Sequence, residues 1–221
     1  MPCLTDLPWS KNGCSQCAEF LGGPKTDIQL VCLNCLTKPP LYQTTVCAFD
    51  YLVPINGLIN QFKHQHNLAA GRLLTACLSQ TIAQALYQGR ALMPQLIIPV
   101  PLHSQRLRQR GFNQAQIIAT GVSRCLKISL MTELSERVGQ HIPQQGQSRQ
   151  KRLTQMTDLF QIRRHNIDPT IQSIAIIDDV MTTGATAQAL SRSLIDAWDG
   201  PLDIQIWCVA RAQPPNALID W

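Results

Sequence analysis

The chain has 221 residues, of which 45% are hydrophobic, and its 19 Lys and Arg against 14 Asp and Glu give a formal net charge of +5. This length fits one domain of ordinary size with a small addition, and the composition is that of a globular protein. No uninterrupted apolar run is long enough to span a membrane, and residues 1–13 lack the apolar core of a signal peptide. We therefore expect a cytoplasmic protein that is not inserted in a membrane.

Two pairs of cysteines form the first motif, Cys14-x2-Cys17 and Cys32-x2-Cys35, with 14 residues between the pairs. Each pair places two thiolates on a tight turn, and four thiolates form a closed tetrahedral Zn²⁺ site. The segment between the pairs is too small to build a hydrophobic core, so the metal would supply its folding free energy. A thioredoxin-like redox role is the alternative for a single pair, but two pairs at this spacing favour structural zinc.

The other cysteines have no such spacing. Cys3 is a spare thiol near the beginning of the chain. The remaining four lie in apolar stretches, where we expect them to be small buried hydrophobic residues: Cys47, Cys77, Cys125 and Cys208.

Strands and helices are predicted to alternate after Pro39-Pro40, which indicates a linker. The predicted strands span 44–53, 95–100, 174–178 and 204–209, and the predicted helices span 55–62, 68–86, 115–126 and 187–197. Such alternation predicts an α/β fold, in which helices cover both faces of a parallel sheet. We expect two domains, a zinc-binding module at 1–38 and the α/β domain at 39–221.

The middle of the chain is basic. Between Asp50 and Glu133 there is no Asp or Glu but eight Lys and Arg, so this interval carries +8, whereas the rest, with 11 basic and 14 acidic residues, carries −3. A surface of one sign attracts phosphate, pyrophosphate or nucleic acid. A solvated basic face that improves solubility is the alternative.

Three arginines follow the second predicted strand and alternate over five residues before a glycine: Arg106, Arg108 and Arg110. A guanidinium group can donate two parallel hydrogen bonds to two phosphate oxygens. These residues are therefore candidates to bind pyrophosphate or the phosphates of DNA. A basic surface turn is the alternative. Further along, the segment from Arg137 to Phe160 is polar and rich in glutamine, which predicts a mobile loop.

The most informative segment is 174–186, with the sequence IAIIDDVMTTGAT. An apolar strand leads to Asp178 and Asp179, and the carboxyl ends of strands in open α/β sheets are where ligands bind. A loop follows, and then a helix whose first backbone N–H groups attract an anion. Gly184 permits a positive φ there. A buried strand before a capped helix is the alternative, but adjacent buried acids without partners are costly. No Gly-Lys-Ser/Thr follows, so the loop is not a Walker A motif.

This segment resembles the phosphoribosyl pyrophosphate (PRPP) motif of type I phosphoribosyltransferases. In that family the two acids bind the ribose hydroxyls and the loop holds the 5′-phosphate, with Mg²⁺ accompanying PRPP. The resemblance implies a PRPP site made of these residues: Asp178, Asp179, Met181, Thr182, Thr183, Gly184, Ala185 and Thr186.

The whole chain resembles the ComF/GntX family, named for bacterial competence and gluconate-associated proteins. The cysteine pairs, the PRPP motif and several shorter motifs carry this resemblance, among them 51–54 (YLVP), 100–102 (VPL), 108–114 (RQRGFNQ) and Ala210-Arg211. It implies a type I phosphoribosyltransferase-like sheet behind the cysteine module. It also implies a role in natural transformation or in the use of DNA as a nutrient, with single-stranded DNA and competence or helicase machinery as partners.

Three functions remain open at this point. The first is a DNA-handling protein that has PRPP or a related nucleotide as its ligand, although four Trp, three Tyr and five Phe offer few side chains for base stacking. The second is an active phosphoribosyltransferase of nucleotide metabolism, in which positioning and electrostatics would stabilise the departing pyrophosphate. The third is a non-catalytic PRPP sensor. No residue identifies an acceptor nucleophile, so the sequence leaves enzymatic activity open.

Overall fold

The structure is a computed structural model, which describes residues 5–22, 30–138 and 159–213. Its centre is a five-stranded sheet in the order β1-β7-β6-β2-β3, in which every neighbouring pair is parallel. The strands are β1 (Thr44–Asp50), β2 (Leu96–Pro99), β3 (Ser129–Leu130), β6 (Ser173–Met181) and β7 (Asp203–Arg211). A second, antiparallel pair joins β4 (Ser135–Arg137) to β5 (Phe160–Ile162).

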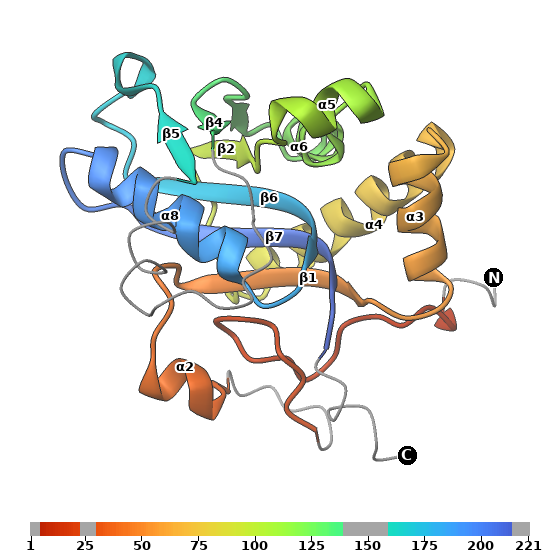
Figure 1. Cartoon of the computed structure of the whole chain (residues 1–221). Helices are drawn as coiled ribbons and strands as arrows, with labels where there is room; N and C mark the ends of the chain where they lie inside the picture. Colours follow the sequence, from red (N-terminus) through yellow and green to blue (C-terminus); the bar gives the residue numbers. More distant parts are fainter. Residues whose placement is uncertain (1–4, 23–29, 139–158, 214–221) are drawn as a thin grey trace, which may run out of the picture.

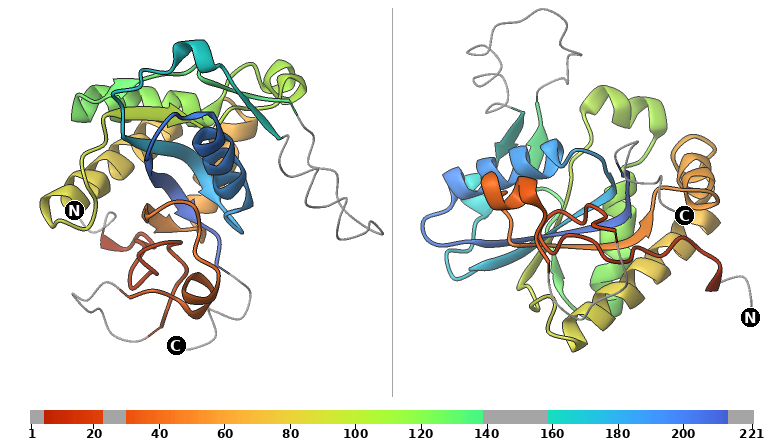
Figure 2. Two further views of the ribbon diagram at one scale, coloured as in Figure 1. Left: turned by 90° about the vertical axis from the view of Figure 1, so that its left-hand side faces the viewer. Right: turned by 90° about the horizontal axis from the view of Figure 1, so that it is seen from below.

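Helices cover both faces of the sheet (Figures 1 and 2). One face packs against α3 (Ile55–His64), α4 (Leu68–Tyr87) and α6 (Gln114–Leu126), and the other against α8 (Ala185–Ala197) and the cysteine segment. Successive residues of the central strands alternate between these two cores, as in Trp207 and Cys208 of β7, both fully buried. The predicted α/β fold with an N-terminal four-cysteine module is confirmed. Among the described residues, none of the helices is long and apolar enough to cross a membrane.

The sheet contains a topological switch point between β2 and β6. From β2 the chain passes through α6 to β3 on one side, whereas from β6 it passes through α8 to β7 on the other side. The two connections therefore leave neighbouring strands in opposite directions and on opposite faces. In an open parallel sheet, the crevice outside the carboxyl ends of two such strands is the expected place for a ligand.

Several predicted features differ from the structure, among them two that pairing or capping decides and the burial of one cysteine. The motif strand continues past Asp178 to Met181, since β7 pairs with it as far as Met181↔Arg211. The basic segment is not an extended turn but the helix α5 (Ser104–Arg110), which His103 caps through its Nδ1 and which ends at Gly111 with φ 74°. Cys125 is exposed rather than buried, unlike the three other cysteines expected to be buried.

The predicted mobile loop from Arg137 to Phe160 begins and ends in paired strands, because Arg137 lies opposite Phe160 in the β4–β5 ladder. The rest of that prediction, residues 139–158, lies outside the described residues, as do Cys3 and half of the segment between the cysteine pairs, residues 23–29.

The N-terminal segment covers β1, which is an edge strand of the sheet. Trp9 forms an antiparallel bridge with Phe49, and their rings lie 4.5 Å apart. Ser15 and Gln16, beside the first cysteine pair, accept hydrogen bonds from the Thr45 backbone N–H and hydroxyl. This cover protects the edge from pairing with another chain. The proposed domain boundary at residue 38 therefore separates segments that are hydrogen-bonded to each other.

Candidate functional site

Two adjacent carboxylates lie near the carboxyl end of β6. The Asp179 backbone N–H donates to Asp178 Oδ1 over 2.8 Å. Lys63 of α3 reaches Asp179 from the neighbouring layer, with Nζ 2.9 Å from Oδ2, and the side chains of this ion pair are only 19% and 13% exposed. Lys63 is one of the basic residues of the acid-free interval, and the sequence does not predict its pairing because Asp179 is more than a hundred positions away. One lysine thus faces two acids.

The Asp178 carboxyl group resists ionisation. Burial removes water from it, and the neighbouring Asp179 charge opposes a second negative charge, so the pKa of Asp178 is raised to about 8. The hydrogen bond from the Asp179 N–H and the charge of Lys63 act in the opposite direction. The pKa of Asp178 therefore lies near neutral pH, so its carboxyl group can exchange or share a proton when a cation or a hydroxyl donor enters the site.

The loop after β6 leads into a helix whose N-cap residue, Gly184, has no side chain to cap it. Gly184 has φ 78°, and a Cβ at this position would lie 2.9 Å from Met181 Cε and 3.0 Å from the Tyr42 hydroxyl, so both backbone and space require glycine. No side chain of the N-cap residue bonds to the first turn of α8, which contains no acidic residue. The Ala185 N–H donates to Thr183 Oγ1 over a long 3.4 Å, and the N–H groups that follow it in this turn are available to an anion.

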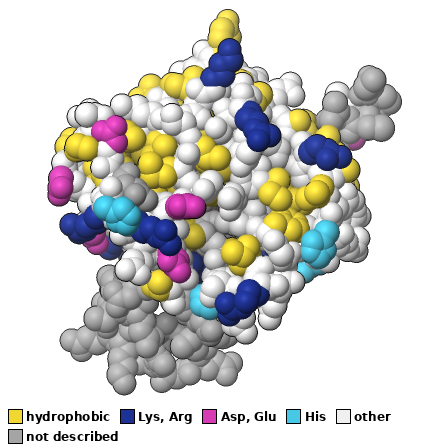
Figure 3. Space-filling model, turned by 90° about the horizontal axis from the view of Figure 1, so that it is seen from above, with side chains coloured by type: hydrophobic (Ala, Val, Ile, Leu, Met, Phe, Trp, Pro, Cys, Tyr) yellow, Lys and Arg dark blue, Asp and Glu magenta, His cyan; other side chains and the backbone are white. Residues whose placement is uncertain are grey.

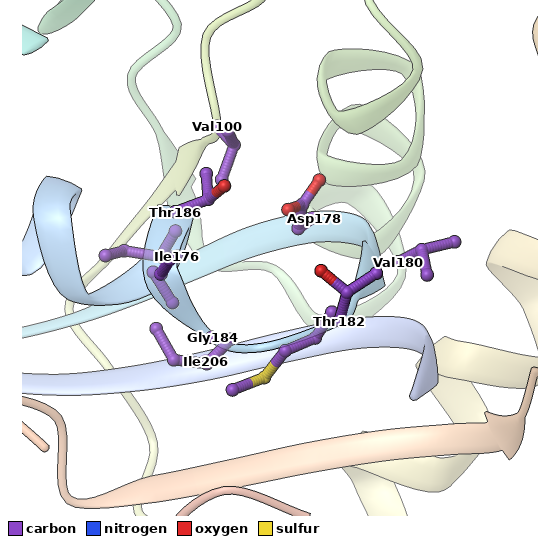
Figure 4. A pocket seen from close by; sticks show the side chains of 11 residues that line it. Val100, Ile176, Asp178, Val180, Thr182, Gly184, Thr186 and Ile206 are labelled. Carbon is purple, nitrogen blue, oxygen red and sulfur yellow. The ribbon is translucent and has the colours of Figure 1, made fainter. Parts of the chain in front are cut away.

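Asp178 and the helix N-terminus share one hollow at the switch point, between the ends of β2 and β6. Figure 4 shows the oxygen atoms of Asp178, Thr182 and Thr186 around this hollow, with Val100 of the β2 end on its far side. Met181, Gly184 and Ala185 also line it. Of the eight predicted PRPP residues, six thus line the hollow. Asp179 lies beside them through its contacts with Asp178 and Lys63, and Thr183 lies in the loop next to Gly184.

The three predicted arginines do not act together. They lie on α5, where residues two positions apart point about 200° apart around the axis, so Arg108 is directed away from Arg106. Arg110 lies one turn beyond Arg106 and donates from Nη1 to Gln114 Oε1 over 3.4 Å. Figure 3 shows the basic side chains of this face apart from one another rather than in one patch.

Arg137, at the end of β4, is a candidate that sequence analysis did not single out. Its guanidinium carbon lies 5.7 Å from the centre of the Phe160 ring. Burial lowers the pKa of Arg137, the positive charge of Arg106 lowers it further, and the negative charge of Asp178 raises it. Among the described residues, neither Arg106 nor Arg137 forms an ion pair. Arg137 therefore lies near enough to the acid of the hollow to interact with its charge, and Arg106 lies near Arg137.

The four predicted metal ligands are brought together. The Sγ atoms of Cys14, Cys17, Cys32 and Cys35 all lie within 4.8 Å of one another. Those of Cys17 and Cys32 are 3.7 Å apart, close to the roughly 3.8 Å that a tetrahedron with metal–sulfur bonds of about 2.3 Å requires. Backbone N–H groups of Cys32 and Cys35 donate to the sulfur atoms of Cys14 and Cys32. These distances and donors fit one tetrahedral metal ion.

The electrostatics of this cluster suit thiolates that share one cation. The hydrogen bond with Cys17 lowers the pKa of Cys14 to about 4 and raises that of Cys17. Burial raises the pKa of Cys35. Ionisation of one thiol thus opposes ionisation of its neighbours. A divalent cation would offset this repulsion by binding all four cysteines as thiolates.

No family model matches the chain. Competence protein F of Haemophilus influenzae is 31% identical to it over 220 residues, which are 95% of each chain. The DNA utilization protein YhgH of Escherichia coli K12 is 30% identical over 201 residues, 91% of this chain and 85% of the relative. Competence protein ComFC of Bacillus subtilis is 29% identical over 101 residues, 46% of this chain and 38% of the relative.

The raised pKa of Asp178 makes stability depend on pH. Because the folded-state pKa is about 8 and the unfolded-state value is about 4, unfolding releases a proton between these values, and stability falls as the pH rises through this window. Asp178→Asn removes this penalty. We expect the gain in melting temperature of the variant over the wild type to increase from about pH 5 to about pH 8. The exposed Asp203→Asn is the control, and a gain that is constant across this range would contradict the assignment.

Proposed function

Because the chain belongs to the ComF family of bacterial competence proteins, we propose that it binds PRPP, or a nucleotide resembling it, and serves the uptake or use of single-stranded DNA. The DNA context rests on the names of the relatives, which are competence and DNA utilization proteins. The ligand rests on one observation: Asp178 and the first turn of α8 line one hollow at the switch point of the sheet, and Asp179 adjoins Asp178.

Each part of this hollow has a distinct role in the proposal. Asp178 and Asp179 form hydrogen bonds with the ribose hydroxyls, and the bond to Asp179, which forms an ion pair with Lys63, is strong because the acceptor is charged. The first N–H groups of α8 and the hydroxyls of Thr182 and Thr186 hold the 5′-phosphate. Arg106 and Arg137 neutralise the pyrophosphate, which arrives with Mg²⁺. In this proposal the ligand lies between the two aspartates, which recognise its sugar, and the two arginines, which recognise its phosphates.

A catalytic phosphoribosyltransferase is the second candidate, because Arg106 and Arg137 form no ion pair with the described residues and could stabilise negative charge on departing pyrophosphate. Incubation with Mg²⁺, PRPP and a panel of nucleobases, followed by detection of pyrophosphate, distinguishes an enzyme from a protein that only binds PRPP. Release that depends on one base would establish catalysis. Binding without release would leave the sensor or DNA-handling function.

The metal of the cysteine cluster is proposed to be Zn²⁺, since four buried thiolates in a tetrahedral arrangement suit this ion. We expect about one zinc per chain in purified protein, measured by elemental analysis. Cys35→Ser should lose the metal and expose residues 1–38 to proteolysis, whereas the exposed Cys125→Ser should keep the metal. Wild-type protein that is free of metal but has a protected N-terminal segment would refute the proposal.

PRPP binding is tested at the acids by calorimetry in the presence of Mg²⁺. A hydrogen bond to a charged group contributes about 1.5–3 kcal/mol, so Asp179→Asn should weaken binding by roughly tenfold or more. Asp203→Asn changes an exposed acid at the opposite end of the sheet and should leave the affinity unchanged. An Asp178→Asn/Asp179→Asn variant that binds PRPP as well as the wild type would remove the argument from the motif.

Substitutions of the arginines distinguish PRPP binding from DNA binding. We expect Arg106→Gln and Arg137→Gln each to weaken PRPP binding by roughly tenfold, and Arg108→Gln, which points away from the hollow, to leave it nearly unchanged. Affinity for single-stranded DNA should fall steeply with salt, since each neutralised phosphate releases counterions. If α5 contacts DNA, Arg108→Gln should instead reduce the slope of log affinity against log salt. DNA binding at background level at about 0.15 M salt would favour the sensor or enzyme.

A further inference from the structure

The guanidinium group of Arg211, the last residue of β7, is buried. The residue is 5% exposed, and it forms no ion pair with the described residues. Its Nε donates to Cys17 O over 2.9 Å, and its Nη1 donates to Met181 O over 3.3 Å and to Ala212 O over 2.8 Å. One side chain therefore bonds to a metal-ligand residue of the cysteine cluster and to the residue that immediately precedes the 182–184 loop.

Charge balance explains why the Arg211 guanidinium group is buried beside the cysteine cluster. A buried cation is costly unless a negative charge or several dipoles compensate it. Three carbonyl dipoles are present, and four thiolates around one divalent cation would add a net negative charge beside them. Arg211 is thus suited to be the counter-ion of the metal–thiolate cluster. Metal binding would strengthen its hold on Cys17, and metal loss would weaken it.

Two further contacts join the same parts of the molecule. The Ala212 N–H donates to Met181 O over 2.9 Å, so the end of β7 holds the end of β6 through the backbone as well. The Tyr42 hydroxyl lies where a Cβ on Gly184 would be 3.0 Å away, so the loop packs on it. Cys17, Cys35, Tyr42, Arg211 and the loop also line one cavity of about 630 Å³. The cluster and the loop are therefore neighbours with a continuous path of contacts.

We propose that Arg211 is a positioning residue that couples the metal cluster to the anion-binding loop. With metal bound, the cysteine module fixes Arg211, and Arg211 fixes Met181 and the backbone N–H groups that follow it. The part of this inference that concerns ligand affinity rests on the proposed PRPP site. The part that concerns the order of the loop does not, because it can be measured without a ligand.

The test compares the wild type with Arg211→Lys, Arg211→Met and Thr45→Val. Arg211→Lys keeps the charge but loses the planar fork that reaches two carbonyls at once. Arg211→Met removes both. Thr45→Val removes a hydrogen bond between the cysteine module and β1, namely that of Thr45 Oγ1 to Gln16 O, without contact to Met181. It therefore reports what simple loosening of the module does.

Two quantities are measured for each protein, with metal and after chelation: hydrogen exchange of the amides at 183–186, and affinity for PRPP with Mg²⁺ or for inorganic pyrophosphate. In the wild type and in Thr45→Val we expect chelation to speed loop exchange and weaken ligand binding by about fivefold or more, which is the usual range of coupling between sites. In Arg211→Met we expect both effects of chelation to fall below about twofold, because the link is already broken. Arg211→Lys should lie between.

The outcomes separate this inference from the proposed function. Wild-type protein that binds neither PRPP nor pyrophosphate would refute the ligand proposal, and the exchange data alone would then decide the coupling. An equal effect of chelation on loop exchange in the wild type and in both Arg211 variants would overturn the role of Arg211. If Arg211→Met does not fold, Arg211→Lys carries the same comparison.

Discussion

The parallel pairing of β6 with β7 is the constraint on which the site depends. The ladder extends from Ser173↔Asp203 to Met181↔Arg211 and therefore fixes both strands to their last residues. This pairing determines the position of Asp178, the point at which the 182–184 loop begins, and the face of the sheet on which the Arg211 side chain lies. A one-residue slip would turn every side chain to the other face, which would move the acid out of the hollow and the arginine away from the cysteines.

Charge is distributed around the hollow in a way that is unfavourable in the free protein. One lysine faces two acids, and Asp178 responds by favouring its neutral form. On the other side, Arg106 and Arg137 have no ion pair with the described residues. A ligand that carries both hydroxyl donors and phosphate groups would relieve both imbalances at once. Such preorganised charges favour binding because they need no rearrangement when the ligand arrives.

Local patterns in the sequence predict local features well and long-range contacts poorly. The apolar runs and the Asp-Asp–loop–helix order predict β6 and α8, and the cysteine spacing predicts the ligands that the structure gathers within 4.8 Å. The pyrophosphate candidates are different, because alternate spacing suggests one clamp for Arg106 and Arg108, whereas a helix separates them. Lys63 and Arg137 join the site only through the packing of α3 and the β4–β5 ladder, which no local pattern contains. Arg211 has a sequence signal in its motif, but its carbonyl partners are known only from the fold.

The position of the cysteine module limits how it can act on the site. It lies along the edge strand β1 and on the α8 face of the sheet, beside the loop, rather than over the carboxyl ends of β2 and β6 (Figure 1). None of the cysteines lines the hollow that contains Asp178. A metal there cannot polarise a ligand in that hollow by contact, so its influence must pass through residues that bond to both parts. The Arg211 side chain bonds to Cys17 and to Met181, and its charge allows it to respond to the charge of the cluster, whereas Tyr42 only packs beside Gly184.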